Sequence, residues 1–322
     1  MFGVVTIGRN EGERLKACFR SIPPATPLVY VDSGSTDGST KVACEFGAKV
    51  IDLDLQRPFT AARARNAGFE RLREEYPHLK YVQFIDGDCV LCPTWLDIAV
   101  AYLESHDNVC AVFGRRRERH PARSIYNQLC DWEWDDVPLG EASECGGDVM
   151  MRLDALTAVN GYRADLIAGE EPELCLRLQR AGWFVWRIDA EMTVHDAAIT
   201  RFAQWGRRAV RNGYALAQGA AIHGSGPERY RVQASRRIWF WGFGVPLLGL
   251  FAMALFGLFA AALFLIYAVQ FLRLLVKNGG SLRERVLRSL FQVLGRFPES
   301  FGQLKFLCDR AFGQQTQLIE YK

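Results

Sequence analysis

Four short apolar stretches, separated by longer amphipathic segments, dominate the first 90 residues of the chain. They are rich in residues that favour strands and lie at residues 2–7, 28–31, 49–53 and 81–85. Strands buried on both faces of a parallel sheet have this continuous apolar pattern. Between the first two stretches, apolar side chains recur at helical spacing at Leu15, Cys18, Phe19 and Ile22. Strands and helices in alternation predict a doubly wound α/β domain.

The alternation continues, less regularly, to residue 196. The pattern predicts a helix capped by Thr60, and another that starts at Glu170. Further helices are expected at residues 93–103 and 154–159, and strands at residues 109–113, 145–152 and 183–188.

A run of 35 residues without a charged side chain, residues 238–272, sets the C-terminal part of the chain apart. As a single helix it would be about 52 Å long, at a rise of about 1.5 Å per residue. The hydrocarbon core of a bilayer is only about 30 Å thick. Arginines and lysines flank the run on both sides, which predicts that both ends lie in the cytoplasm. A transmembrane hairpin or a re-entrant pair satisfies both observations, and one tilted span is the alternative.

The uneven charge of the chain favours the same interpretation. Residues 197–322 carry 17 Lys and Arg against 5 Asp and Glu, whereas residues 1–196 carry 22 against 31. A basic segment beside an apolar run favours an anionic membrane surface over nucleic acid as partner. Nine cysteines without a spacing framework indicate thiols in a reducing compartment. With residues 2–7 too short for a signal peptide, we expect the inner (cytoplasmic) membrane, with the N-terminal domain facing the cytoplasm.

Two carboxylates follow the fourth predicted strand directly, at Asp86 and Asp88, with Gly87 between them. In open α/β sheets, ligands bind outside the carboxyl ends of the strands. This spacing suits a hard divalent cation that a phosphate-bearing ligand also coordinates, although an ordinary strand-to-turn junction has the same residues. Asp32 ends the second strand in the same way, and either ligand binding or turn formation explains it.

Two further places carry candidate residues: the start of one predicted helix and the end of one predicted strand. Arg65 and Asn66 lie in the first turns of the helix capped by Thr60, where arginine is unfavourable for the helix dipole. A nearby phosphate would explain them, and a solvated helix face is the alternative. The run Arg115 to Arg117 is most simply a solvated basic edge, with an acidic acceptor as the second interpretation.

Three glutamates crowd the start of the helix at residue 170: Glu170, Glu171 and Glu173. The helix dipole favours carboxylates at this end, so stability alone explains them. The functional alternative is that one of them is a general base. His195 lies in the segment 194–196 that closes the predicted domain, and by itself it is interpreted as structural.

Taken in order, these segments resemble motifs of the family 2 glycosyltransferases, which are inverting enzymes with the GT-A fold. The resemblance covers roughly residues 2–212 and rests on five weak motifs in the right order. They are the first strand with Asn10 and Glu11, the loop that starts at Asp32, Ala64 to Gly68, the Asp-x-Asp motif at Asp86 to Asp88, and Gly169 to Leu174.

By position, the resemblance implies a role for each candidate residue. Asn10, Glu11, Asp32 and Asp86 would bind the nucleotide-sugar, with Arg65 and Asn66 nearby. Asp88, with His195, would hold Mn²⁺ or Mg²⁺ on the diphosphate. Glu171 would be the catalytic base, with Glu170 as the second candidate. The family often has Asp where this chain has Glu171, and residues 204–208 lack the Trp of the Gln-x-x-Arg-Trp motif, which argues against processive polymerisation.

The resemblance implies a membrane-anchored, metal-dependent hexosyltransferase. It would move a sugar, with inversion, from a nucleotide diphosphate-sugar to a lipid-linked or polysaccharide acceptor. Synthases that glycosylate a polyprenyl phosphate are one alternative, although their Asp-x-Asp-Leu-Gln motif is absent at residues 86–90. A catalytically silent sugar-nucleotide-binding scaffold is the other. The expected domains are a GT-A domain at 1–212, a basic linker at 213–237, a transmembrane hairpin at 238–276 and an amphipathic interfacial segment at 277–322.

Overall fold

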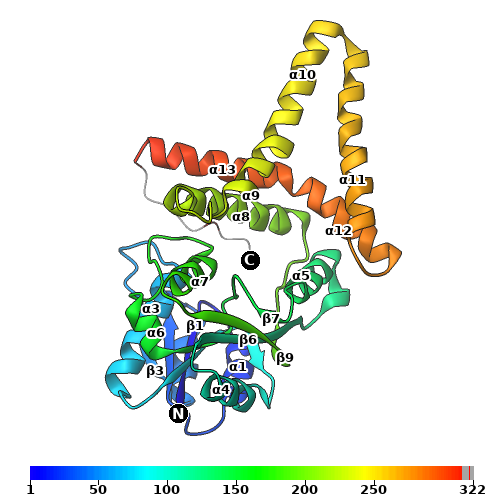
Figure 1. The fold of residues 1–322 in the computed structure, drawn as a ribbon. Coiled ribbons are helices and arrows are strands. Elements are labelled where there is room, and N and C mark those ends of the chain that lie inside the picture. The colour runs from blue at the N-terminus through cyan, green and yellow to red at the C-terminus, as the bar shows by residue number, and fades with distance from the viewer. Residues whose placement is uncertain (314–318, 320–322) are drawn as a thin grey trace. The chain divides into compact units, whose positions relative to one another are not determined.

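A computed structural model describes residues 1–313 and residue 319. The chain divides into two compact units, Met1–Thr200 and Arg201–Lys322 (Figure 1). The boundary differs from the expected one at 212, because helix α8 (Phe202–His223) is continuous through that position. Most of the expected linker at 213–237 is likewise helical, in α8 and in α9 (Val232–Trp239).

One mixed nine-stranded sheet forms the centre of the first unit, in the order β3-β2-β1-β4-β8-β6-β9-β5, with β7 pairing with β9. β3, β2, β1 and β4 are parallel, whereas β8 runs antiparallel to both of its neighbours. The strands are β1 Phe2–Gly8, β2 Leu28–Asp32, β3 Lys49–Asp52, β4 Tyr81–Asp86, β5 Cys89–Leu91, β6 Val109–Glu118, β7 Gly140–Glu141, β8 Val149–Arg152 and β9 Phe184–His195.

The register of the parallel strands brings the predicted polar strand ends to one edge of the sheet. Gly8 pairs with Asp32 on β2, and Ile7 pairs with Asp86 on β4. The interiors of β1, β2 and β4 are fully buried, as the continuous apolar pattern predicts, whereas β3 at the end of the sheet is only partly buried. Helix α3 (Ala61–Glu75) packs closely on this sheet because Gly68 has no side chain: a Cβ there would overlap Val5.

Helices and turns of the first unit connect these strands: α1 Glu13–Arg20, α2 Ser39–Glu45, α3, α4 Trp95–Ser105, the 3₁₀ turn Pro121–Arg123, α5 Ile125–Asp135, α6 Leu153–Ala158 and α7 Glu170–Arg180. Thr60 caps α3 as expected, since its side chain accepts a hydrogen bond from the Arg63 N–H at 3.1 Å. α7 starts at Glu170, after Gly169 in the left-handed conformation.

Two strands differ in extent from what the sequence pattern indicates. β6 continues through Arg115 to Arg117, because these residues pair with the end of β9 across two irregularities in the register. The interpretation of this run as a solvated basic edge is wrong for Arg116, whose Nη2 lies 3.0 Å from the buried Asp148 carboxylate. β8, by contrast, begins only at Val149, so the glycines before it form a loop.

The second unit is helical: α8, α9, the π-helical turn Phe240–Gly244, α10 Val245–Phe256, the 3₁₀ segment Leu258–Phe264, α11 Leu265–Lys277, α12 Leu282–Leu294 and α13 Arg296–Ala311. Glycines let α8 and α13 touch backbone to backbone. A Cβ on Gly213 of α8 would overlap the Glu299 carbonyl, and one on Gly302 of α13 would overlap the Val210 carbonyl.

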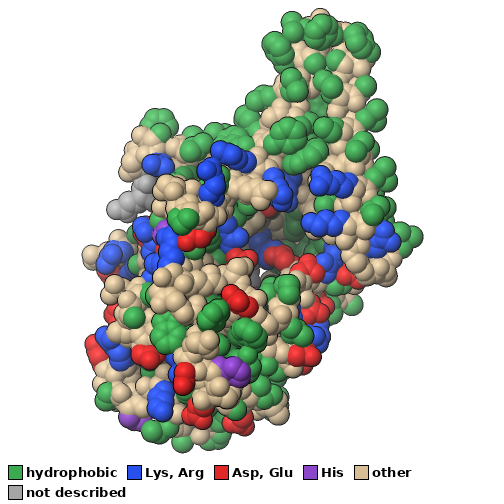
Figure 2. Space-filling view, viewed as in Figure 1, with side chains coloured by type: hydrophobic (Ala, Val, Ile, Leu, Met, Phe, Trp, Pro, Cys, Tyr) green, Lys and Arg blue, Asp and Glu red, His purple; other side chains and the backbone are tan. Residues whose placement is uncertain are grey.

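The long apolar run forms two antiparallel arms that reverse at Gly257 (Figure 1). Two helical stretches, Val232–Phe256 and Leu258–Lys277, are long and apolar enough to cross a membrane, by length and composition only. The run therefore forms a hairpin rather than one tilted helix. Figure 2 shows apolar side chains over its arms and basic ones near its base. Of the expected interfacial segment, residues 314–318 and 320–322 lie outside the described residues.

Candidate active site

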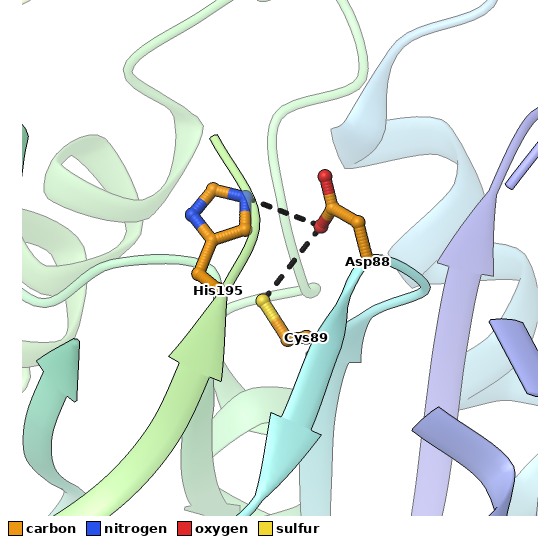
Figure 3. Close-up of side chains that lie close together, drawn as sticks. All are labelled: Asp88, Cys89 and His195. Carbon is orange, nitrogen blue, oxygen red and sulfur yellow. Dashed lines mark hydrogen bonds and ion pairs between the residues drawn. The ribbon is translucent and has the colours of Figure 1, made fainter. Parts of the chain in front are cut away.

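Asp86, Gly87 and Asp88 form the tight connection between β4 and β5. The Gly87 N–H donates to the Ile7 carbonyl at 2.8 Å, which holds this turn against the end of β1. β5 then pairs antiparallel with the end of β9, so that Cys89 lies opposite His195. This pairing brings His195 to Asp88, with Nε2 3.2 Å from Oδ1 (Figure 3).

Asp88, Cys89 and His195 are all buried, and each offers one potential ligand atom within 4.8 Å of the others. Trp134 of α5 packs on the imidazole, with ring centroids 4.8 Å apart. A carboxylate oxygen beside an imidazole nitrogen is a donor set that Mn²⁺ and similar divalent ions accept. Among the described residues, His195 Nδ1 has no hydrogen-bond partner. The residues present thus fit the divalent cation that the sequence predicts.

Asp148 is a buried carboxylate that the sequence analysis missed. Its Oδ1 accepts the Asp86 backbone N–H at 3.1 Å, and its Oδ2 accepts the Thr193 hydroxyl at 2.8 Å. Burial opposes ionisation of Asp148, but Arg116, His195 and the hydrogen bonds from Thr193 and Asp86 together lower the pKa of this carboxyl. Asp148 therefore fixes the β4 end as a charged anchor. In the sequence, only the two glycines before Asp148 at the start of a predicted strand pointed to this position.

Arg65 is buried and lies among three carboxylates. Its Nη2 contacts Asp86 Oδ1 at 2.9 Å, and its Nη1 lies 3.0 Å from Glu170 and 2.9 Å from Glu171. A Cβ on Gly147 would overlap this guanidinium, so the glycine makes room for it. The solvated-face interpretation is thus wrong for Arg65, which connects the acidic strand end to the start of α7.

The three glutamates of α7 differ in their surroundings. Glu173 pairs with Arg177 one turn later, at 2.9 Å, as in an ordinary helix. The Glu170 side chain is 4% exposed, and the Glu171 side chain is 15% exposed. Burial and the neighbouring Glu170 raise the pKa of Glu171 to about 7, although Arg65 opposes the shift. Glu171 is therefore the more accessible carboxyl of the pair and titrates near neutral pH.

The remaining predicted binding residues organise loops at the same edge. The Asp32 carboxylate accepts the backbone N–H groups of Gly34 and Ser35 at 2.9 and 2.7 Å. Asn10 Oδ1 accepts the Thr36 N–H at 2.7 Å, which ties the β1 loop to the β2 loop.

Two further predicted binding residues, Glu11 and Asn66, contact protein groups outside these two loops. Glu11 pairs with Arg14 at 2.8 Å. Asn66 exchanges two hydrogen bonds with the Tyr162 backbone, at 2.7 and 2.8 Å, so its side chain holds a turn of the fold.

Comparison with known proteins gives a consistent result. The Glycosyl transferase family 2 model matches residues 4–155. Glycosyltransferase AglE of Haloferax volcanii is 23% identical over 187 residues, which is 54% of this chain and 60% of that protein. The succinoglycan biosynthesis protein ExoA of Rhizobium meliloti is 25% identical over 209 residues, which is 58% of this chain and 60% of that protein. The matched part thus spans about 60% of each relative.

Solved structures share the fold. The mannosyltransferase PcManGT from Pyrobaculum calidifontis, in complex with GDP-Man and Mn²⁺, matches with a TM-score of 0.61 at 18% identity, over 95% of this chain and 87% of its own. S. aureus TarS 1-349 matches with a TM-score of 0.53 at 14% identity, over 97% of this chain and 92% of its own. The predicted GT-A-type α/β fold, followed by two long apolar helices, is confirmed.

Proposed function

Residues 4–155 of this chain are a glycosyl transferase family 2 domain, and on that premise we propose a metal-dependent, inverting hexosyltransferase. It moves a sugar from a nucleotide diphosphate-sugar to a hydroxyl of a lipid-linked glycan at the cytoplasmic face of the inner membrane. The observation that carries the proposal is the buried pair of Asp88 and His195 beside Asp86 at the carboxyl end of β4. Ligands bind at this edge in open α/β sheets.

Asp88 and His195 hold the divalent cation, Mn²⁺ or Mg²⁺. When bound, the cation stabilises the negative charge of the leaving diphosphate. PcManGT, the structural relative described above, binds GDP-Man and Mn²⁺, which supports the assignment. The Asp86 side chain is 30% exposed, so one part of it pairs with Arg65 while another faces the ligand edge.

The nucleotide lies against the loops after β1 and β2. Asp32 and Asn10 hold these loops in one conformation through the hydrogen bonds described above. Such fixed loops bind a ligand at a smaller entropic cost than mobile ones. Glu11 contributes from the end of β1. Arg65 and Asn66 act as positioning residues, since both terminal nitrogens of Arg65 contact carboxylates and the Asn66 amide contacts the Tyr162 backbone.

Glu171 is the general base, and Glu170 is its buried neighbour. Inversion requires that a base remove the proton of the acceptor hydroxyl on the face opposite the leaving group. A pKa of about 7 leaves Glu171 partly deprotonated at neutral pH and still basic enough to accept a proton.

The helical hairpin anchors the enzyme. Its exposed arms are apolar and its flanking segments are basic, a combination that suits a bilayer with an anionic inner surface. Anchoring favours an acceptor that is itself in the membrane. We keep the expected order of a catalytic domain followed by a hairpin, and move its bounds: the catalytic part ends at 200 instead of 212, and the hairpin spans residues 245–277 instead of 238–276.

The test is a transfer assay with the full-length protein in detergent, after a thermal-shift screen of nucleotide sugars. A rise in melting temperature with one donor, followed by release of its nucleoside diphosphate when a lipid-linked glycan is added, supports the proposal. Transfer to a bare polyprenyl phosphate instead would favour the polyprenyl-phosphate glycosyltransferase. Donor binding without turnover on any acceptor would favour the silent scaffold.

A further inference from the structure

Cys89 contacts the same carboxylate oxygen as His195. Asp88 Oδ1 lies 3.2 Å from His195 Nε2 and 3.7 Å from Cys89 Sγ (Figure 3). Cys89 and His195 are opposite each other in the β5–β9 ladder, so both side chains extend to the same face of the sheet. The thiol is therefore fixed at the cation site by strand pairing and by the turn before it.

The Asp88–His195 and Asp88–Cys89 distances can be compared with those around a bound metal ion. A tetrahedral ion, with bonds of about 2.0 Å to nitrogen and oxygen and about 2.3 Å to sulfur, separates a carboxylate oxygen from a ring nitrogen by about 3.3 Å and from sulfur by about 3.5 Å. The Asp88–His195 and Asp88–Cys89 distances are close to these values. One carboxylate, one thiol and one imidazole are also a donor set that zinc-like ions prefer.

We propose that Asp88, Cys89 and His195 form a three-ligand site for a thiophilic divalent cation of the Zn²⁺, Co²⁺ or Cd²⁺ class. This inference rests on the proposed role of Asp88 and His195 as ligands of the activating ion. Binding forms a metal–sulfur bond and releases the thiol proton to solvent, with no change of oxidation state. The fourth position stays open to water or a phosphate oxygen.

Hard ions use the same site differently. Mg²⁺ prefers oxygen ligands and leaves a thiol protonated. Cys89 Sγ also lies within 4.8 Å of the carboxylate oxygens of Asp86 and Asp148. A thiolate among these carboxylates is unfavourable unless the cation bonds to the sulfur directly. Cys89 therefore makes the site selective, so that thiophilic ions compete with the activating ion by a contact that Mg²⁺ does not use.

Cobalt is the probe, because a thiolate ligand gives Co²⁺ a charge-transfer absorption in the near ultraviolet. The full-length protein in detergent is treated with EDTA and titrated with Co²⁺, with and without GDP or UDP. We expect the charge-transfer band in the wild type, its loss in Cys89→Ser and its persistence in Cys92→Ser. Cys92 is the matched control, since it is three residues away and belongs to neither ligand group.

Competition with Cd²⁺ gives a second readout. Cys89→Ser is expected to weaken Cd²⁺ binding about tenfold or more, and to change Mn²⁺ binding by less than about twofold. If Cys89→Ser does not fold, the Co²⁺ spectra of Cys89→Ala and of the wild type are compared instead, and loss of the charge-transfer band in Cys89→Ala supports the proposal.

The outcomes separate this inference from the proposed function. Co²⁺ binding to the wild type without a charge-transfer band overturns the role of Cys89 and leaves Asp88 and His195 as ligands. If neither Mn²⁺ nor Co²⁺ binds with either nucleotide, the metal site of the proposed function fails as well.

Discussion

Arg65 Nη1 lies 2.9 Å from Glu171 Oε1, although the two residues come from different helices, α3 and α7. The same guanidinium also contacts Asp86 at the end of β4. One buried cation thus joins the proposed donor side to the proposed base and holds them at a fixed separation. Because it is shared among three carboxylates, it does not compensate each of them fully, which is consistent with the raised pKa of Glu171.

The first prediction concerns the identity of the base. Glu171→Gln is expected to lower kcat by about 10²- to 10⁴-fold, because the amide cannot accept the hydroxyl proton. Donor affinity should stay nearly unchanged, since the base acts on the acceptor. Glu170→Gln is the matched control, with a smaller loss of kcat and a larger loss of melting temperature because that side chain is buried. If Glu170→Gln lowered kcat more than Glu171→Gln does, Glu170 would be the base instead of Glu171.

The second prediction follows from the Glu171 pKa of about 7. The base must be deprotonated to act, so kcat should rise between about pH 6 and 8 and level off above. The residual activity of Glu171→Gln should lack this rise. A rate that is flat across neutral pH in the wild type, with chemistry rate-limiting, would contradict the assignment.

The same pKa has the opposite consequence for stability. Since the folded-state pKa is raised, the stabilising contribution of this carboxyl is present below its unfolded value, near 4.5, and is lost as the pH rises through about 7. Glu171→Gln should therefore stabilise the fold relative to the wild type more at pH 8 than at pH 5, by thermal unfolding at both pH values.

The third prediction concerns the cation. Asp88→Asn removes a charge from the site and keeps its shape, so transfer should fall by about 10²-fold or more while the protein stays folded. EDTA should abolish wild-type activity, and added Mn²⁺ should restore it. Undiminished transfer in EDTA, or in Asp88→Asn, would exclude a metal-dependent reaction.

The fourth prediction concerns Asp148 and Arg116. Asp148→Asn leaves the largely buried Arg116 without its charge partner, and should destabilise the fold by about 3–5 kcal/mol. Asp165→Asn is the control, because the ion pair between Arg163 and Asp165 is largely exposed and is worth about 0–1 kcal/mol. Chemical denaturation measures both. Equal effects of the two substitutions would mean that the buried pair contributes no more than the surface pair.

The fifth prediction concerns topology. Both flanks of the hairpin are basic and its arms are antiparallel, so the N-terminal domain and the C-terminal end should lie on the cytoplasmic side. A cytoplasm-active reporter fused after Lys322 should be active, and one inserted at Gly257 should be inactive. If a single arm crossed the membrane, the C-terminal reporter would lie outside the cytoplasm and would be inactive.

The sequence predicts those parts of the site that are local. Asp32 and Asp86 end apolar strands, and parallel strands must bring such ends together, so their common edge follows from the pattern alone. The start of α7 at Glu170 and the cap at Thr60 are likewise local features. The hairpin follows from the length of the apolar run against the thickness of a bilayer.

Contacts that depend on long-range pairing were not predictable. Cys89 lies opposite His195 because β5 pairs with the end of β9, and the sequence of a three-residue strand does not indicate which strand it pairs with. Arg116 was interpreted as solvated because an arginine run resembles a surface loop, whereas β6 continues through it. The charge partner of Asp148 is Arg116 on β6, and the residues next to Asp148 in the sequence do not indicate this contact.

The backbone contact of α8 with α13 has a consequence for the order of events during synthesis. α8 leaves the ribosome first, both hairpin arms follow, and α13 emerges last. Because Gly213 and Gly302 seat each helix directly on the other, α8 lacks its backbone contact with α13 until residue 302 has emerged. The bundle therefore closes around a hairpin that is already complete, and insertion into a bilayer would precede assembly of the helices at its base.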